Sequence, residues 1–190
     1  MSLKIAIITG STRDARAGKH VTDWFRAQIK ETEGTQFDIV DLAEENLPFL
    51  NEPGLPSMGN YQLESTKKWS EKIASYDGYV FVTPEYNHGY PATLKNAIDT
   101  LYREWQKKPV AFVGYGVMGG VRSIEQLVPV VAQIGMVPIP YATVNIIESY
   151  ATVDEHGSIK TEAIKGNGAD KLVAELTWWA KVLQAARKEA

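Results

Sequence analysis

Three short loops of this sequence carry residues suited to ligand binding, and each follows an apolar segment. The first loop runs from Ser11 to Lys19 and holds two hydroxyls, two arginines and a lysine. These donors, together with the N–H groups of a following helix, suit a phosphate. An ordinary strand-to-helix turn with arginines on its solvent side explains the same residues equally well. The loop lacks both the Walker Gly-Lys-Ser/Thr and the G-x-G-x-x-G spacing, so a single phosphate suits it best.

The second loop, Pro84 to Pro91, combines stiff, flat and polar groups. Backbone groups near Glu85, Tyr86 and Asn87 could read the edge of a planar ring. A tyrosine of this loop could stack on such a ring or cover one side of it. The alternative is a rigid turn whose tyrosines pack against a neighbouring subunit.

The third loop, Gly114 to Gly120, has four glycines in seven residues. Glycine allows a ligand to approach the backbone closely, although a mobile loop has the same composition. A phosphate site at one end and a ring site at the other predict a mononucleotide, and a flavin above others.

Other chemistries have less support. The three histidines show no metal-ligand spacing, and the absence of cysteine excludes disulfides, thiolate nucleophiles and cysteine-bound metals. No G-x-S-x-G nucleophile elbow is present. The acidic stretch from Asp38 to Glu45 is interpreted as a solvated edge.

The elements that must position these loops alternate between strand and helix. This alternation predicts an α/β fold in which helices cover both faces of a parallel sheet. Loops that follow parallel strands gather at one sheet edge, where ligands of such folds bind. Strands are expected at 4–9, 37–42, 79–83, 109–113 and 137–144, and helices at 18–32, 62–75, 92–102, 121–134 and 169–188.

The remaining segments allow narrower expectations. The proline-rich loop 43–60 is either a packed lid or a cover for the core edge. Pro129 should bend its helix or sit in the first turn. Pro138 and Pro140 mark the last strand as a sheet edge, and 152–165 is expected to be an exposed connection.

Length and composition predict one domain spanning residues 1–190. The 190 residues are 44% hydrophobic and 23% charged, with a formal net charge of −3. This charge argues weakly against non-specific nucleic-acid binding. No apolar stretch reaches the length of a membrane helix, and the N-terminus lacks a signal-peptide layout. We therefore expect a cytoplasmic protein with no membrane partner.

Three motifs, in order, resemble the NADPH-dependent FMN reductase family, which includes azo-, quinone- and chromate-reducing members. They are Gly10-Ser11-Thr12-Arg13, Thr83-Pro84-Glu85-Tyr86-Asn87, and Gly114-Tyr115-Gly116 with Gly119-Gly120-Val121-Arg122. The resemblance covers about residues 3–150, and Pro-Glu-Tyr-Asn is its most specific part. One departure is Gly114, where the family often has a hydroxyl residue.

The resemblance implies a flavodoxin-like three-layer sandwich with bound FMN and a five-stranded parallel sheet in the order 2-1-3-4-5. The residues implied to hold the FMN phosphate are Ser11, Arg13, Arg16, Gly18, Lys19 and His20. Those implied to line or touch the flavin ring are Pro84, Glu85, Tyr86, Asn87, Tyr115 and Gly116.

The implied activity is transfer of hydride from NAD(P)H to FMN and then of electrons to a quinone, azo compound, free flavin or similar acceptor. The flavin carries this chemistry, so no catalytic side chain is assigned. Family members are commonly homodimers or homotetramers, and Tyr102 and Trp105 suit either such an interface or the core. The alternatives are an FMN-binding electron carrier without NAD(P)H oxidation, which the Arg-bearing loop disfavours, and an interaction module without flavin.

Overall fold

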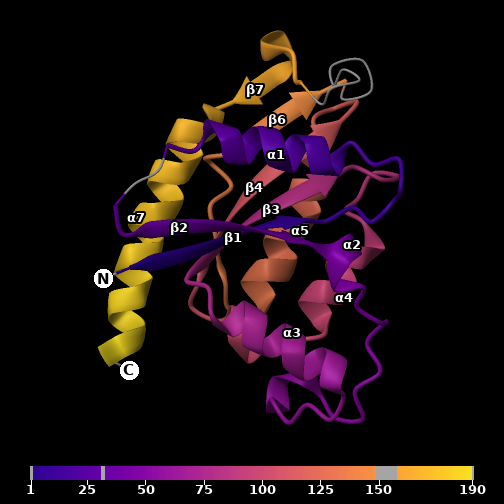
Figure 1. The fold of residues 1–190 in the computed structure, drawn as a ribbon, viewed down its shortest axis with the longest axis vertical. Helices are drawn as coiled ribbons and strands as arrows, with labels where there is room; N and C mark the ends of the chain where they lie inside the picture. Colours follow the sequence, from indigo (N-terminus) through magenta and orange to yellow (C-terminus); the bar gives the residue numbers. More distant parts are fainter. Residues whose placement is uncertain (1, 31–32, 149–157, 190) are drawn as a thin grey trace.

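The computed structural model describes residues 2–30, 33–148 and 158–189 as a central sheet covered by helices (Figure 1). Five parallel segments form the core of the sheet in the order β2-β1-β3-β4-β6, which confirms the predicted order. They are β1 (Leu3–Thr9), β2 (Thr35–Asp41), β3 (Gly78–Pro84), β4 (Pro109–Gly116) and β6 (Val144–Ile147).

The part of the sheet beyond β4 differs from the prediction. The expected fifth strand is split into β5 (Val137–Pro138) and β6, and both pair with β4. A further strand, β7 (Ile164–Gly166), pairs antiparallel with β6, so the predicted last strand is not a sheet edge at Val144. Among the described strands β5 pairs only with β4, so Pro138 does lie at an edge, as predicted, and Pro140 lies outside the strands. The end of the predicted exposed connection 152–165 is also wrong, because Ile164 and Lys165 belong to β7. This strand has three residues, too few to show a strand pattern in the sequence. Residues 152–157 of the predicted connection lie outside the described part of the chain.

Each strand supplies both faces of the sheet because successive side chains point to opposite sides. Ile5 and Ile7 pack with α1 (Gly18–Gln28) and α7 (Gly168–Glu189) in one apolar cluster. Ala6 and Ile8 pack in a second cluster with α3 (Glu64–Ala74), α4 (Ala92–Asp99) and α5 (Val121–Gln133). The two helical layers hold the sheet rigidly from both sides, which positions the loops at its ends (Figure 1).

Helix boundaries refine two expectations. Helix α4 ends at Asp99, and residues Arg103–Trp105 form a separate 3-10 turn, η2. Trp105 is fully buried and its indole donates to the Ile98 carbonyl at 3.1 Å, so it belongs to the core and not to an interface. Pro129 lies inside α5, beyond the first turn.

The 43–60 loop is ordered and tied to its neighbours. It contains the end of α2 (Leu42–Glu45) and the 3-10 turn η1 (Pro56–Met58). The Asn96 side chain holds it twice, by accepting from the Leu50 N–H at 2.8 Å and donating to the Pro48 carbonyl at 2.9 Å. Yet Phe49 and Leu55 are 76% and 72% exposed, so much of its apolar surface faces outward.

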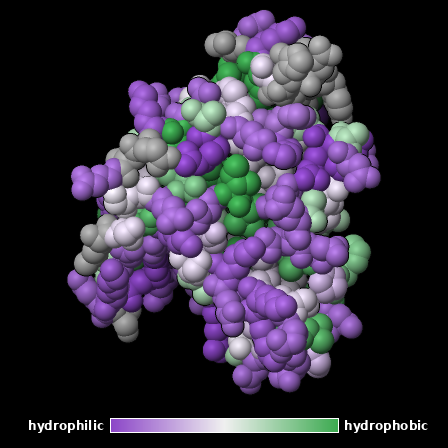
Figure 2. All heavy atoms as spheres, in the orientation of Figure 1, coloured by the Kyte–Doolittle hydropathy of each residue, from purple (hydrophilic) through white to green (hydrophobic). Residues whose placement is uncertain are grey.

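The outer surface is largely hydrophilic on the face shown in Figure 2, where apolar atoms gather near the centre. The edge strand β2 crosses this face (Figure 1), and its Ile39 is 44% exposed. Across the described ranges, we find no helix with the length and apolarity required to span a membrane.

Candidate functional site

The three predicted loops meet at one edge of the sheet, because their parallel strands end within a few residues of one another. Thr9 of β1 lies beside Val82 of β3, and Pro84 of β3 lies beside Tyr115 of β4. A cleft of about 60 Å³ opens between the loops. Its lining combines Arg13, Ala15, Arg16 and Ala17 of the first loop with Pro84, Glu85, Tyr86, Tyr115 and Gly116.

The N-terminus of α1 is open to an anion. Ala17 occupies the cap position and provides no side-chain acceptor, and the first turn contains no acidic residue. Helix N–H groups and the helix dipole therefore lack a negative partner there. Gly18 packs closely against Tyr115: a Cβ at this position would lie 2.5 Å from the Tyr115 hydroxyl oxygen, so a larger residue would require the tyrosine to shift.

Arg16 is held from one side only. Its Nη2 donates to Asp41 Oδ2 at 2.5 Å, and the other Asp41 oxygen accepts from the Ala43 N–H at 3.1 Å. Its Nε is buried and has no hydrogen-bond partner within the described part of the chain. A guanidinium fixed in this way keeps its Nε–H, among other N–H groups, as a donor for a ligand oxygen.

The role of Asp41 was not visible in the sequence. The acidic stretch was predicted to be a solvated edge, and for Asp41 this is wrong, because only 7% of the residue is exposed. Its partner Arg16 lies 25 positions earlier in the chain, which no local pattern reveals.

The first and second loops touch each other through predicted site residues. Ser11 is fully buried, and its Oγ lies 2.6 Å from the Tyr86 hydroxyl oxygen. The Arg13 guanidinium lies 5.9 Å from the centre of the Tyr86 ring, within cation–π range. The tyrosine therefore bridges the two loops and narrows the cleft.

Lys19 and His20 are exposed and do not line the cleft. Lys19 instead pairs with Asp23 of the same helix at 2.6 Å, and the hydrogen bond to this carboxylate raises the pKa of Lys19. Because Asp23 neutralises Lys19, their contribution to binding an anion would come mainly from backbone N–H groups at the start of α1.

The second loop contains a tight turn at residues 86–89. Tyr86 and Gly89 exchange two backbone hydrogen bonds, at 2.8 and 3.1 Å. Asn87 and His88, between them, have φ of 49° and 72°. Left-handed backbone in two successive non-glycine residues costs free energy and is common at functional sites. The N–H groups of Glu85 and Tyr86 are used within the protein, whereas Asn87 and His88 are exposed at the tip of the turn and accessible to a ligand.

The third loop is a fixed turn. Gly120 has φ of 70° and caps α5, and a Cβ there would lie 2.7 Å from the Gly114 Cα. The Asn145 side chain, which sequence reasoning missed, donates to the Gly119 carbonyl at 2.8 Å. At Gly114 a Cβ would lie 2.5 Å from that same carbonyl oxygen, so the hydroxyl residue common in the family has no room here.

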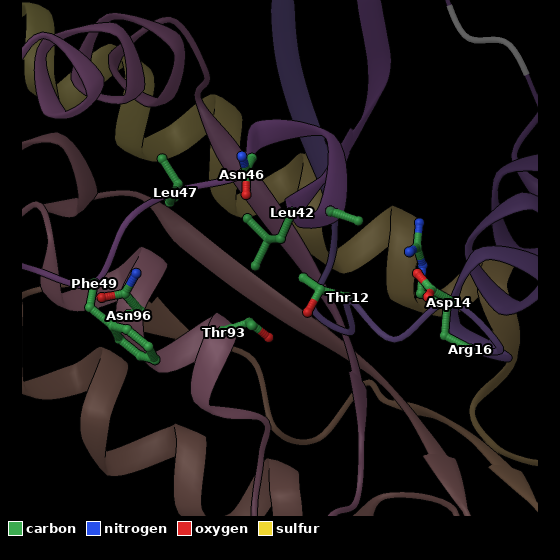
Figure 3. Close-up of a pocket in the computed structure, with 10 residues that line it drawn as sticks. Thr12, Asp14, Arg16, Leu42, Asn46, Leu47, Phe49, Thr93 and Asn96 are labelled. Atoms are coloured by element: carbon green, nitrogen blue, oxygen red, sulfur yellow. The ribbon is translucent and has the colours of Figure 1, made fainter.

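A second pocket of about 370 Å³ lies on the other side of the first loop. Figure 3 shows Asp14 and Arg16 together at one end, and Phe49 and Asn96 at the other. Thr12 and Thr93 face the space between them (Figure 3). Arg16 lines both this pocket and the cleft, so the first loop forms a wall shared by the two.

The strand order, the open helix N-terminus after β1 and the fixed glycine turn after β4 define a flavodoxin-like α/β protein. The model of one family, NADPH-dependent FMN reductase, matches residues 3–151. The chain belongs to this family, which confirms the resemblance predicted from its motifs.

Two curated relatives agree with this assignment, and one solved structure agrees with the fold. A Nectria protein, NAD(P)H-dependent FMN reductase ntnL, is 45% identical over 130 residues, covering 65% of each chain. A Schizosaccharomyces pombe protein, NAD(P)H-dependent FMN reductase C4B3.06c, is 47% identical over 126 residues, 65% of this chain and 63% of the relative. The chain thus spans slightly less than two thirds of these relatives.

The solved structure is FerB, a flavoenzyme NAD(P)H:(acceptor) oxidoreductase from Paracoccus denitrificans. It superposes with a TM-score of 0.62 at 22% identity, covering 96% of this chain and 98% of FerB. At this identity the comparison confirms the flavodoxin-like fold.

Proposed function

We propose that residues 1–190 form one FMN-binding domain and that the protein is an NAD(P)H-dependent oxidoreductase. Its acceptor would be a quinone, an azo compound, free flavin or a similar small molecule. FMN, when bound, supplies the chemistry by accepting hydride from NAD(P)H and passing electrons to the acceptor. Family membership supports the activity, and the buried, unpartnered Nε of Arg16 beside an uncapped helix N-terminus carries the assignment of the phosphate end.

The residues of the chain fit this cofactor at both ends of the site. At the phosphate end, Ser11, Arg13, Arg16 and the start of α1 (Gly18, Lys19, His20) supply hydroxyl, guanidinium and backbone donors. At the ring end, Pro84–Asn87, Tyr115 and Gly116 provide flat backbone and aromatic surface. The cleft of about 60 Å³ is far smaller than a mononucleotide, so we expect the contact between Ser11 and Tyr86 to open on binding.

An anaerobic absorbance titration of the purified protein tests this function. We expect a yellow protein, or one that takes up added FMN, whose flavin absorbance is bleached by NADPH or NADH. A protein that binds FMN but is not bleached by either nucleotide would be an electron carrier. A colourless protein that also fails to bind added FMN would overturn the proposal.

An Arg13→Ala variant separates this function from an interaction module without flavin. Under our proposal the variant loses retained FMN, because a cation at the phosphate end is removed. Unchanged flavin retention would show that Arg13 takes no part in binding.

We further propose that the protein works in the cytoplasm, where NAD(P)H is available, as a homodimer or homotetramer. Phe49, Leu55 and Met58 support self-association, because all three are more than half exposed on a loop that is held in place. Sedimentation of the wild type and a Phe49→Ser/Leu55→Ser variant tests this. A monomeric wild type, or a variant that associates equally well, would contradict the proposed interface.

A further inference from the structure

The exits of β3 and β4 are joined by one carboxylate. Glu85 Oε1 accepts from the Arg122 side chain at 2.8 Å, and Glu85 Oε2 accepts from the Arg122 backbone N–H at 3.2 Å. The carboxyl side chain is only 10% exposed, whereas the arginine is 41% exposed. A residue at the end of one strand therefore caps the helix that follows another.

This cap is needed because α5 has none of its own. Its N-cap residue is Gly120, which has no side chain, and its first turn contains no acidic residue. A carboxylate at a helix N-terminus satisfies orphan N–H groups and the helix dipole. Glu85 supplies this charge from 37 positions away.

The backbone strengthens the same connection. The Glu85 N–H donates to the Tyr115 carbonyl at 3.1 Å, and a Cβ at Gly116 would lie 3.5 Å from the Glu85 Cβ. On its other side the glycine turn is held by the Asn145 side chain. The turn at 116–120 is thus fixed from β3 and from β6.

We propose that Glu85 is a positioning residue that locks the second and third loops into one rigid platform for the flavin ring. This inference rests on the proposed FMN function. The N–H group and both carboxylate oxygens of Glu85 are engaged within the protein, so its role is to hold Gly116 and the start of α5 beside the cleft. Glu85 also neutralises the charge of Arg122, so we assign this arginine a structural role as the partner of Glu85.

Three variants separate the parts of this connection. Glu85→Ala removes both contacts, Glu85→Gln retains an oxygen for the helix N–H, and Arg122→Met removes only the side-chain partner. Glu64→Gln is the matched control, because Glu64 also lies in the first turn of a helix and pairs with Lys67 at the same 2.8 Å. That pair lies on α3, away from the loops.

The first measurement uses the protein without flavin. Hydrogen exchange at residues 116–122 should be faster in Glu85→Ala than in the wild type, with Glu85→Gln and Arg122→Met between them. Loss of hydrogen bonds to a charged group should raise exchange there by about tenfold or more. Unchanged exchange in Glu85→Ala would overturn the proposal, and Glu64→Gln should match the wild type.

The second measurement compares FMN with riboflavin, which lacks the phosphate. Because Glu85 acts at the ring end, Glu85→Ala should weaken both ligands by a similar factor, about tenfold. It should also change the reduction potential of bound FMN, which a purely structural contact elsewhere would not. Unchanged affinity and potential would refute the positioning role, and so would a loss confined to FMN.

If Glu85→Ala fails to fold, Arg122→Met carries the same tests. A wild type that binds neither flavin would refute the proposed function, while the exchange experiment would still test the lock.

Discussion

Replacing Arg16 by methionine should separate binding of the phosphate from binding of the ring. The side chain is 14% exposed, and it pairs with Asp41, whose side chain is 8% exposed. Methionine keeps an unbranched chain of similar reach but removes every donor. A hydrogen bond to a charged group contributes about 1.5–3 kcal/mol, which converts to roughly 10- to 150-fold in affinity. We therefore expect FMN to bind Arg16→Met weaker by a factor in this range.

Riboflavin is the internal control of this experiment. It lacks the phosphate, so its affinity should be unchanged by Arg16→Met if the guanidinium acts only on that group. Titration of both ligands by quenching of flavin fluorescence gives the two dissociation constants. Equal weakening of FMN and riboflavin would refute the assignment of Arg16 to the phosphate and would indicate general loss of loop structure.

Stability provides an independent check on the same residue. Removing one partner of a buried pair costs roughly 3–5 kcal/mol. Asp41 keeps its bond from the Ala43 N–H, so we expect a loss of about 2–3 kcal/mol in urea unfolding of the flavin-free protein. Asp41→Asn should also be destabilised, because the amide retains the cap but not the ion pair. Wild-type stability in both variants would mean that the pair does not form in solution.

Three further predictions concern packing, pH and the ordered loop. Gly18→Ala should lower stability by about 1–2 kcal/mol through overpacking against the Tyr115 hydroxyl, and Tyr115→Phe should recover part of this loss in thermal unfolding. Burial lowers the pKa of Lys108 to about 8 in the folded protein, from an ordinary value of 10.5. Between these two pH values the unfolded chain binds more protons than the folded one, so the free energy of unfolding rises with pH in this window. Relative to Lys108→Met, the wild type should gain about 2 kcal/mol between pH 8 and 10 in urea unfolding, and a constant difference would contradict this. Asn96→Leu should speed proteolysis within residues 46–60 several-fold, and an unchanged cleavage rate would show that Asn96 does not hold the loop.

Most of the sheet was predictable because its strands are buried on both faces and appear as continuous apolar runs. The segment Ile5–Ile8 is such a run, and it forms the centre of β1. The strand β7 was not predictable, since it has three residues of which only Ile164 is apolar, and its pairing partner supplies the stabilising contacts. The break between β5 and β6 follows from Pro138 and Pro140, which interrupt the ladder.

The positions of the candidate loops were predictable from topology, whereas the contacts that fix them were not. Parallel strands bring the three loops to one edge whatever their sequence. The pairs that hold them, Arg16 with Asp41 and Glu85 with Arg122, join residues 25 and 37 positions apart. Asn145 reaches Gly119 across 26 positions. Isolated polar side chains such as these carry no periodic signal, so only the folded chain reveals their partners.

These pairs also give the residues at the proposed phosphate end different roles. Arg16 is neutralised by Asp41 and Lys19 by Asp23, so both contribute donors with little net charge. No carboxylate partner of Arg13 is found in the part of the chain that the structure describes, and its guanidinium lies over the Tyr86 ring. The net positive charge that attracts a phosphate should therefore come from Arg13 and the α1 dipole. Arg16 would instead orient the phosphate through its fixed N–H donors.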